Sequence, residues 1–168
     1  MSLTLCKIDL VETTSTPSPL PSQTRASGEA CSTDITLSCT INAEAKRIFH
    51  ALIEPEYREL WMRIPDQDEN ARIIASNSRD LFRLDYYRFG QLDLSIVGCY
   101  RICRHRRQVF NWWRNTPTST SSLVELRLDG SFSSSVLRLK HRGLGTEAEY
   151  IWHSQMWRAS LTSLALLF

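Results

Sequence analysis

The sequence closes with the stretch TEAEYIWHSQMWRASLTSLALLF (residues 146–168), which has the pattern of one long amphipathic helix. Thr146 and, three residues later, Glu149 form a capping box that marks its first turn. Four large apolar residues follow at spacings of four, three and four, which places them on one helix face: Trp157, Leu161, Leu164 and Phe168. Because a helix of about 20 residues is about 30 Å long, this element can cross a whole small domain.

Six strand-like segments precede this helix, and no helical pattern interrupts them. Their predicted bounds are 73–75, 81–87, 92–103, 109–114, 123–128 and 134–141. Turn signals separate several of them, at Phe89 and Gly90, at the basic residues 104–107, and at Asp129 and Gly130. Consecutive strands without intervening helices predict an antiparallel sheet in which neighbours in sequence are neighbours in space.

The region before these strands predicts one more strand and two short helices. Residues 35–41 alternate apolar and polar side chains, as a half-buried strand does. Asn42 is expected to be the N-cap of the first helix, with Glu44 in its first turn. Pro55 ends that helix and begins a second one, which continues through Trp61.

Residues 1–33 differ in composition from the rest of the chain. Ser, Thr and Pro dominate residues 11–33, and large apolar residues are almost absent there. Such a segment buries too little apolar surface to offset the entropy lost on ordering. We therefore predict a disordered tail over residues 1–33 and one folded domain over residues 34–168.

The order of elements predicts an α+β fold of the form β-α-α-β6-α. One curved sheet cannot close its own core, so the long C-terminal helix is expected to lie on its concave face. The two short helices are then expected to cover one end of the space between sheet and helix.

Four strings of this sequence resemble segments of a known superfamily. They are IFHALIEPEYRELW (48–61), VGCYRICRHRRQVFNWW (97–113), LRLKHRGL (137–144) and HSQMWRASLTSL (153–164). In this order and spacing they resemble the helix-grip or SRPBCC proteins, which include the START domains and the birch pollen allergen. The closest match is the branch named after the activator of heat-shock-protein-90 ATPase. The resemblance implies a helix-grip fold over residues 35–168, but the superfamily is functionally mixed, so the fold does not settle the function.

The sequence also departs from the pattern of that branch. Asn77 and Ser78 stand where the branch has a Gly-Gly turn, and the turn at 104–107 lacks its proline. Gln108 stands where the branch has leucine, and Met156 where it has glycine. A bulky Met156 beside Trp157 is expected to narrow the cavity or tilt the helix, so the ligands of the branch are not carried over to this chain.

Composition narrows the function classes. Net charge is only +2, no apolar run approaches the roughly 20 residues of a membrane span, and the first ten residues carry no secretory signal. A cytoplasmic location is therefore expected. No CxxC, HExxH, GxSxG or Gly-rich phosphate loop is present. We accordingly expect no cofactor and no metal, and the sequence does not favour an enzyme.

A cavity between sheet and helix is the most informative candidate site. Strand alternation groups Ile96, Gly98, Tyr100 and Ile102 on one side of their strand, and Gln108, Phe110 and Trp112 on one side of the next. The family resemblance implies that both groups face the long helix. The predicted cavity lining is Trp61, Phe82, Leu84, Tyr86, Ile96, Tyr100, Gln108, Phe110, Trp112, His141, His153 and Trp157. A buried glutamine needs a partner, which a ligand or water would supply.

Two alternatives to a ligand site concern the same residues. The predicted lining describes equally well a core that side chains fill completely. His141 and His153 are expected to approach each other near the cavity mouth, where each either makes a local hydrogen bond or serves as a polar anchor or acid/base group.

Three functions follow from these observations. The leading hypothesis is a binding module for one apolar or amphipathic small molecule. The second is a protein-interaction module of the chaperone-cofactor type, which attracts an acidic protein through Arg104, Arg106 and Arg107, in a stretch without acidic residues from 94 to 124. The third is a cyclase- or hydrolase-like enzyme using His141, His153 or Tyr100. Nucleic acid is not a favoured partner, because no groove-reading helix or RNP-type motif is present.

Overall fold

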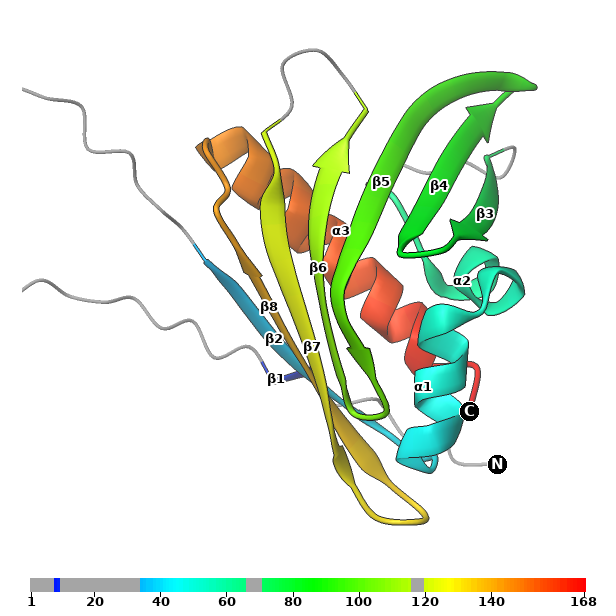
Figure 1. Ribbon diagram of the computed structural model, residues 1–168, viewed down its shortest axis with the longest axis vertical. Coiled ribbons are helices and arrows are strands. Elements are labelled where there is room, and N and C mark those ends of the chain that lie inside the picture. The colour runs from blue at the N-terminus through cyan, green and yellow to red at the C-terminus, as the bar shows by residue number, and fades with distance from the viewer. Residues whose placement is uncertain (1–7, 10–33, 66–70, 116–119) are drawn as a thin grey trace, which may run out of the picture.

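A computed structural model of the chain describes residues 8–9, 34–65, 71–115 and 120–168. The strands within these residues form one antiparallel sheet in the order β1-β2-β8-β7-β6-β5-β4-β3 (Figure 1). Each strand from β3 to β8 pairs with its neighbour in sequence, and β2 joins the sheet beside β8. The predicted antiparallel meander is therefore confirmed.

Strands β2 to β8 agree with the predicted segments except at their ends, and β1 was not predicted. The strands are β1 (Ile8–Asp9), β2 (Ile35–Ile41), β3 (Arg72–Ser78), β4 (Leu81–Arg88), β5 (Gln91–Arg104), β6 (Arg107–Arg114), β7 (Ser122–Gly130) and β8 (Ser135–Arg142). Phe89 and Gly90 form the predicted turn with φ values of 50° and 77°. The last hairpin, in contrast, does not turn at Gly130, which still pairs with Ser135 in the sheet. The turn instead spans residues 131–134, where the N–H of Ser131 donates to the carbonyl of Ser134 (2.9 Å).

In the first turns of the first and third helices, some of the capping contacts differ from those that the sequence predicts. The helices are α1 (Ala45–Ile53), α2 (Pro55–Trp61) and α3 (Glu147–Ala165). Asn42 is not the N-cap of α1: the N–H of Ala43 donates to Ile41 in a tight turn, and Glu44 takes the cap position. At α3, Thr146 accepts from the N–H of Glu149 as predicted, but the Glu149 carboxylate accepts from Gly145 and not from Thr146. Helix α3 also ends at Ala165, before the predicted end at residue 168.

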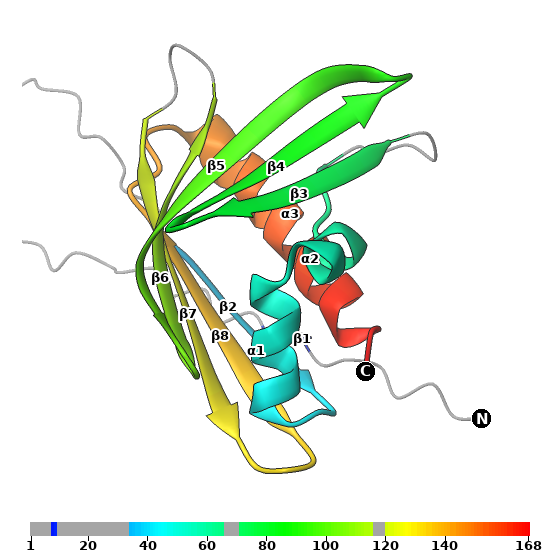
Figure 2. The same cartoon turned by 45° about the vertical axis from the view of Figure 1, so that its right-hand side comes forward.

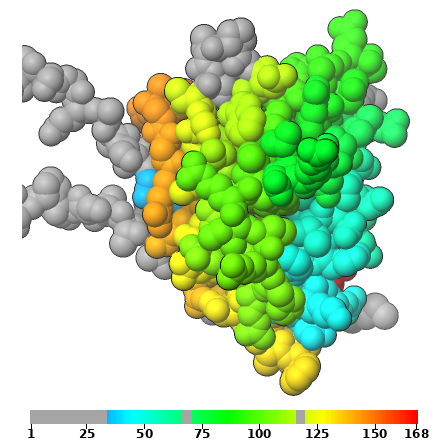
Figure 3. All heavy atoms as spheres, viewed as in Figure 1, coloured from blue at the N-terminus to red at the C-terminus, as the bar shows by residue number. Residues whose placement is uncertain are grey.

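Helix α3 lies on the concave face of the sheet, and α1 and α2 cover one end of it (Figures 1 and 2). From the convex side, the side chains of the sheet cover most of α3 (Figure 3). Trp157, Leu161 and Leu164 of the predicted helix face are buried, and Phe168 packs half-buried against the same core. This is the helix-grip fold that the sequence predicts. No helix in the described residues is long and apolar enough to cross a membrane.

The edge of the sheet at β3 is partly covered by α2. The N–H of Ala75 donates to the Glu59 side chain of α2 at 2.8 Å, so a side chain takes the place of a neighbouring strand.

The predicted tail falls mostly outside the described residues. Within it, Ile8 and Asp9 form β1, which pairs with Cys39 and Ser38 of β2. The disorder predicted for the other residues of 1–33 therefore lies outside what the structure describes.

Candidate functional site

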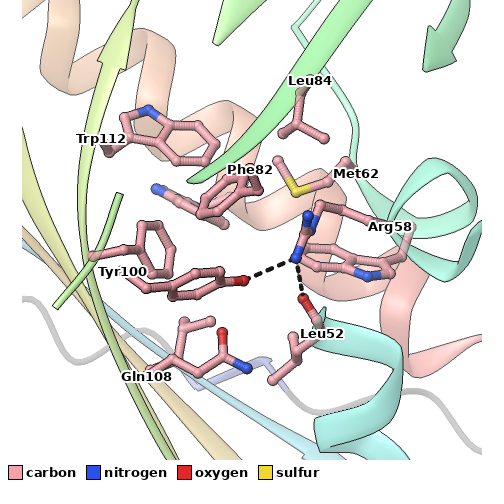
Figure 4. A pocket seen from close by; sticks show the side chains of 12 residues that line it. Leu52, Arg58, Met62, Phe82, Leu84, Tyr100, Gln108 and Trp112 are labelled. Carbon is pink, nitrogen blue, oxygen red and sulfur yellow. Dashed lines mark hydrogen bonds between the residues drawn. The ribbon is translucent and has the colours of Figure 1, made fainter. Parts of the chain in front are cut away.

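A narrow pocket lies between the sheet, helix α2 and helix α3 (Figure 4). Its lining residues are Leu52, Arg58, Trp61, Met62, Phe82, Leu84, Tyr100, Gln108, Phe110, Trp112, Leu126 and Trp157. The cavity has a volume of about 10 Å³, about the smallest space that holds one water molecule. In this conformation side chains fill nearly all of the space between sheet and helix.

Aromatic rings fill the centre of the pocket. Phe82 of β4 contacts Tyr100 of β5 and Phe110 of β6, with ring centroids 5.1 Å apart in both pairs. Phe82 lies directly across from Gly98 in the sheet, and a Cβ at Gly98 would overlap the Phe82 ring. The absence of a side chain at Gly98 therefore lets the Phe82 ring lie against the sheet and fill the pocket.

Arg58 of α2 is a pocket residue that the sequence analysis missed. Its side chain is 2% exposed and lies over the Phe82 ring, with Cζ 4.5 Å from the centroid. Nη1 donates to Asn77 (2.9 Å), and Nη2 donates to the carbonyl of Leu52 (2.9 Å) and to the hydroxyl of Tyr100 (2.9 Å). No carboxylate of the described residues lies within ion-pair distance of it. A spacing of three residues from Trp61 was the one available signal that Arg58 shares the buried face of α2.

Gln108 enters the pocket from β6. Its side chain is 2% exposed, and its Nε2 has no hydrogen-bond partner in the described part of the chain. The inward position predicted for this residue is therefore observed. An unpaired buried amide costs about 1–3 kcal/mol, so this position is unfavourable for stability alone.

His141 and His153 form a second buried polar cluster, which we call the histidine network. Their ring centroids are 4.7 Å apart, so the predicted approach of the two residues is confirmed. The indole of Trp157 donates to Nδ1 of His141 (3.0 Å), and Nε2 of His141 lies 2.7 Å from the hydroxyl of Ser122. The indole of Trp112 donates to Nε2 of His153 (3.2 Å).

The hydrogen bonds of the network fix the proton positions. An indole N–H is only a donor, so Nδ1 of His141 must be an acceptor and Nε2 must carry the proton. That proton points to Ser122, whose hydroxyl in turn donates to the carbonyl of Trp112 (3.0 Å). His153 accepts at Nε2 and donates from Nδ1 to the carbonyl of Glu149 (2.8 Å). Every ring nitrogen thus has a complementary partner.

Burial keeps both rings neutral. It lowers the pKa of His141 well below its usual value, and neighbouring His153 lowers it further. Burial lowers the pKa of His153 to about 4. Although Ser122 and His141 are as close as a serine–histidine catalytic pair, the proton on Nε2 leaves His141 unable to accept the serine proton. The hydrogen-bond directions therefore fit a structural role for this pair.

The predicted lining residues separate into two groups. Eight of them line the pocket: Trp61, Phe82, Leu84, Tyr100, Gln108, Phe110, Trp112 and Trp157. The other four are buried without lining it: Tyr86, Ile96, His141 and His153. Tyr86 retains a buried hydroxyl without a partner among the described residues. Whether any of the twelve binds a ligand remains a prediction.

The turn at residues 104–107, which we call the basic turn, includes an ion pair that the sequence did not indicate. Arg107 donates to Glu125 of β7 (2.9 Å). Glu125 lies 18 residues away in sequence, so sequence patterns do not reveal this pair. Arg104 and Arg106 are exposed and make no ion pair with the residues that the structure describes. A groove of about 260 Å³ lies on the outer face of β7 and β8, lined by Glu125, Arg127, Asp129, Arg138, Lys140 and Arg142.

Comparison with known proteins identifies the fold only. No family model matches the sequence, and no curated protein is similar to it. Among solved structures, a Rhodobacter sphaeroides protein superposes with a TM-score of 0.68 at 13% identity, covering 96% of this chain and 97% of that one. A Chromobacterium violaceum protein gives 0.64 at 15%, covering 80% and 96%. CalU16 from Micromonospora echinospora gives 0.56 at 19%, covering 81% and 74%. These similarities agree with the helix-grip class.

Proposed function

We propose that this protein is a binding module for one amphipathic small molecule, held between the sheet and helix α3. The observation that carries the proposal is the buried, unpaired amide of Gln108 in a pocket whose other walls are mainly aromatic and aliphatic. Apolar walls with a few convergent polar groups are typical of small-molecule sites. The four sequence strings support a place in the branch named after the activator of heat-shock-protein-90 ATPase, and a cytoplasmic location stays a prediction.

The size of the pocket sets a condition on this function. Ligand pockets usually enclose about 300–1,000 Å³, whereas this cavity has about 10 Å³. The ligand must therefore displace side chains that fill the pocket in this structure, which we call the closed form. Phe82 is the best candidate, because its ring occupies the centre and rests on Gly98, where no side chain interlocks with it.

Titration with an environment-sensitive apolar dye tests the proposal. The full chain should bind the dye saturably, and long-chain or aromatic small molecules should displace it. Quenching of tryptophan fluorescence should accompany binding, because Trp61, Trp112 and Trp157 line the pocket. Phe110→Ala should change the affinity while the protein stays folded.

Phe132→Ala is the matched control, since Phe132 is 89% exposed and lies in the turn between β7 and β8. It should leave dye binding unchanged. Dye binding that is absent from the folded protein, or that depends on Phe132 and not on Phe110, would overturn the proposal.

A second candidate function is the attraction of an acidic protein segment. The observation in its favour is that the basic turn continues into the outer groove: the carbonyl of Arg106 accepts from Leu128 of β7, and Arg107 lies opposite Arg127. On β8, Arg138, Lys140 and Arg142 point outward at every second residue, about 7 Å apart along the strand. An extended acidic segment presents its own alternate side chains at the same spacing.

Replacing Arg104, Arg106 and Arg107 with Gln tests this candidate. Retention on an acidic protein column should fall at low salt, while the melting temperature and dye binding stay unchanged. Because exposed charges are screened over about 8 Å at physiological ionic strength, the difference should disappear at high salt. Equal retention of both proteins at low salt would exclude a role for Arg104, Arg106 and Arg107 in this attraction.

A further inference from the structure

The polar side chains that line the pocket, Arg58, Tyr100 and Gln108, carry more donor hydrogens than acceptor oxygens. The hydroxyl of Tyr100 accepts from Arg58, so its own hydrogen is left to donate, and it has no acceptor among the described residues. Burial raises the pKa of Tyr100, which keeps that hydrogen in place. The Nε2 group of Gln108 offers two more hydrogens without an acceptor. The pocket thus has donors in excess of acceptors.

The pocket also holds a buried positive charge. Burial lowers the pKa of the Arg58 guanidinium, yet an arginine side chain stays protonated in proteins. Its hydrogen-bond partners in the structure are neutral oxygens: Asn77, Tyr100, and the Leu52 and Ile53 carbonyls at the end of α1. The Glu54 carboxylate interacts with it electrostatically but makes no ion pair with it. The C-terminal end of a helix carries a partial negative charge, which compensates Arg58 only in part. Buried charges in proteins are usually paired with an opposite charge.

We propose that the ligand of this pocket carries an anionic oxygen group, of which a carboxylate is the simplest, and that Arg58, Tyr100 and Gln108 bind it. This inference rests on the proposed function. The anion supplies both the missing acceptors and the missing negative charge, while the apolar part of the ligand takes the space that Phe82 fills in the closed form. Charge-assisted hydrogen bonds of this kind are stronger than bonds between neutral groups.

The alternative to anion binding by Arg58 is a purely structural role for this side chain. Arg58 joins the end of α1 to β3 and β5 through Leu52, Asn77 and Tyr100, and such a joint stabilises the domain without any ligand. The joint does not explain Gln108, because the Gln108 amide takes no part in it. A ligand series can separate the two roles.

The experiment compares dodecanoate, dodecanol and dodecyltrimethylammonium as dye competitors of the full chain, all below their micelle-forming concentrations. Hydrogen bonds to a charged group are worth about 1.5–3 kcal/mol, so dodecanoate should bind at least tenfold more tightly than dodecanol. The cationic amphiphile should bind most weakly. The preference should survive high salt, because the charge that causes it is buried.

Variants then assign the preference to residues. Gln108→Leu should lower the preference for dodecanoate over dodecanol several-fold. Arg58→Gln should abolish the preference. Arg106→Gln is the matched control, because it makes the same change at an exposed arginine and should have no effect. If Arg58→Gln does not fold, Gln108→Leu still provides the test.

The possible failures are distinguishable. If dodecanol or the cationic amphiphile binds as tightly as dodecanoate to the wild-type protein, the anion inference is overturned and the binding function stands. If the carboxylate preference is unchanged in Gln108→Leu, or is lost in Arg106→Gln, the assigned site is wrong. If no amphiphile binds the folded protein, the proposed function fails and the inference fails with it.

Discussion

Two buried polar clusters lie on the same side of the sheet, and they differ in how completely their hydrogen bonds are matched. In the histidine network every donor meets an acceptor, from the Trp157 indole to the Trp112 carbonyl. In the pocket, Gln108 and Tyr100 keep hydrogens without acceptors among the described residues, and Arg58 makes no ion pair with them. The comparison teaches that burial of polar residues alone does not mark a binding site. Unmatched donors together with an unpaired buried charge separate the proposed ligand site from the histidine network.

The largest effect is expected when the Trp157 side chain is removed from the histidine network. Trp157→Ala removes a large buried side chain and the hydrogen bond to His141, and it should cost about 3–5 kcal/mol of unfolding free energy. Urea unfolding followed by circular dichroism measures the loss. Phe132→Ala is the surface control and should change stability by less than about 0.5 kcal/mol. A loss below about 1 kcal/mol for Trp157→Ala would mean that the network does not support the core.

The second test changes the charge of the network through pH. His153 protonates near pH 4 when folded, whereas an unfolded histidine does so near pH 6.5. Below pH 6.5 the unfolded chain therefore binds more protons, and the unfolding free energy should fall as pH falls toward 4, by up to about 1.4 kcal/mol per pH unit for each histidine. Above pH 6.5 this contribution is complete and constant.

His153→Gln should reduce the slope of stability against pH, because glutamine does not titrate. Phe132→Ala changes an exposed side chain and no titratable group, so it is the control that should leave the slope unchanged. Equal slopes for the wild-type protein and His153→Gln would contradict a neutral buried His153. Unfolding curves at intervals between pH 4.5 and 7.5 supply the measurement.

The third test concerns the unpaired amide of Gln108. Gln108→Leu removes an unsatisfied buried amide and fills the space with a side chain of similar size, so it should raise the unfolding free energy by about 1 kcal/mol. Gln91→Leu, at an exposed position of β5, is the matched control and should have little effect. A clear destabilisation by Gln108→Leu would show that the amide already has a partner, such as an ordered water.

The smallest effect is expected where neither cluster is involved. Deletion of residues 1–33 removes only β1 from the described sheet, and both clusters lie within residues 34–168. The melting temperature should shift by no more than a few degrees, in line with surface changes below about 0.5 kcal/mol. A large drop in the melting temperature would show that the segment packs on the domain.

Sequence patterns predicted the elements well because each pattern is local. Alternation in β2 and the spacing of Trp157, Leu161 and Leu164 in α3 depend only on neighbouring residues, and both are observed. The alternation predicted along β5 fails after Tyr100, because the register with β6 shifts between Tyr100 and Ile102. Ile102 consequently pairs with Val109 and does not share the inward face of Tyr100.

The pocket could be predicted only in part. Eight of the twelve lining residues were predicted: six from strand alternation, and Trp61 and Trp157 from the helical segments. Arg58 was missed because its partners Asn77 and Tyr100 lie 19 and 42 residues away in sequence, and a charged residue on a short helix usually faces solvent. The cavity volume also lies beyond sequence patterns, since it depends on how Phe82 packs against Gly98.

The contact between Glu59 and Ala75 has a consequence for how copies of this protein behave at high concentration. An exposed edge strand is a template on which further chains can add, and uncontrolled addition leads to aggregation. At β3 the Glu59 carboxylate occupies the N–H of Ala75 and places a negative charge on that edge. An incoming strand would have to displace this carboxylate before it could pair there. One acidic side chain of α2 thus discourages edge-to-edge polymerisation at this position.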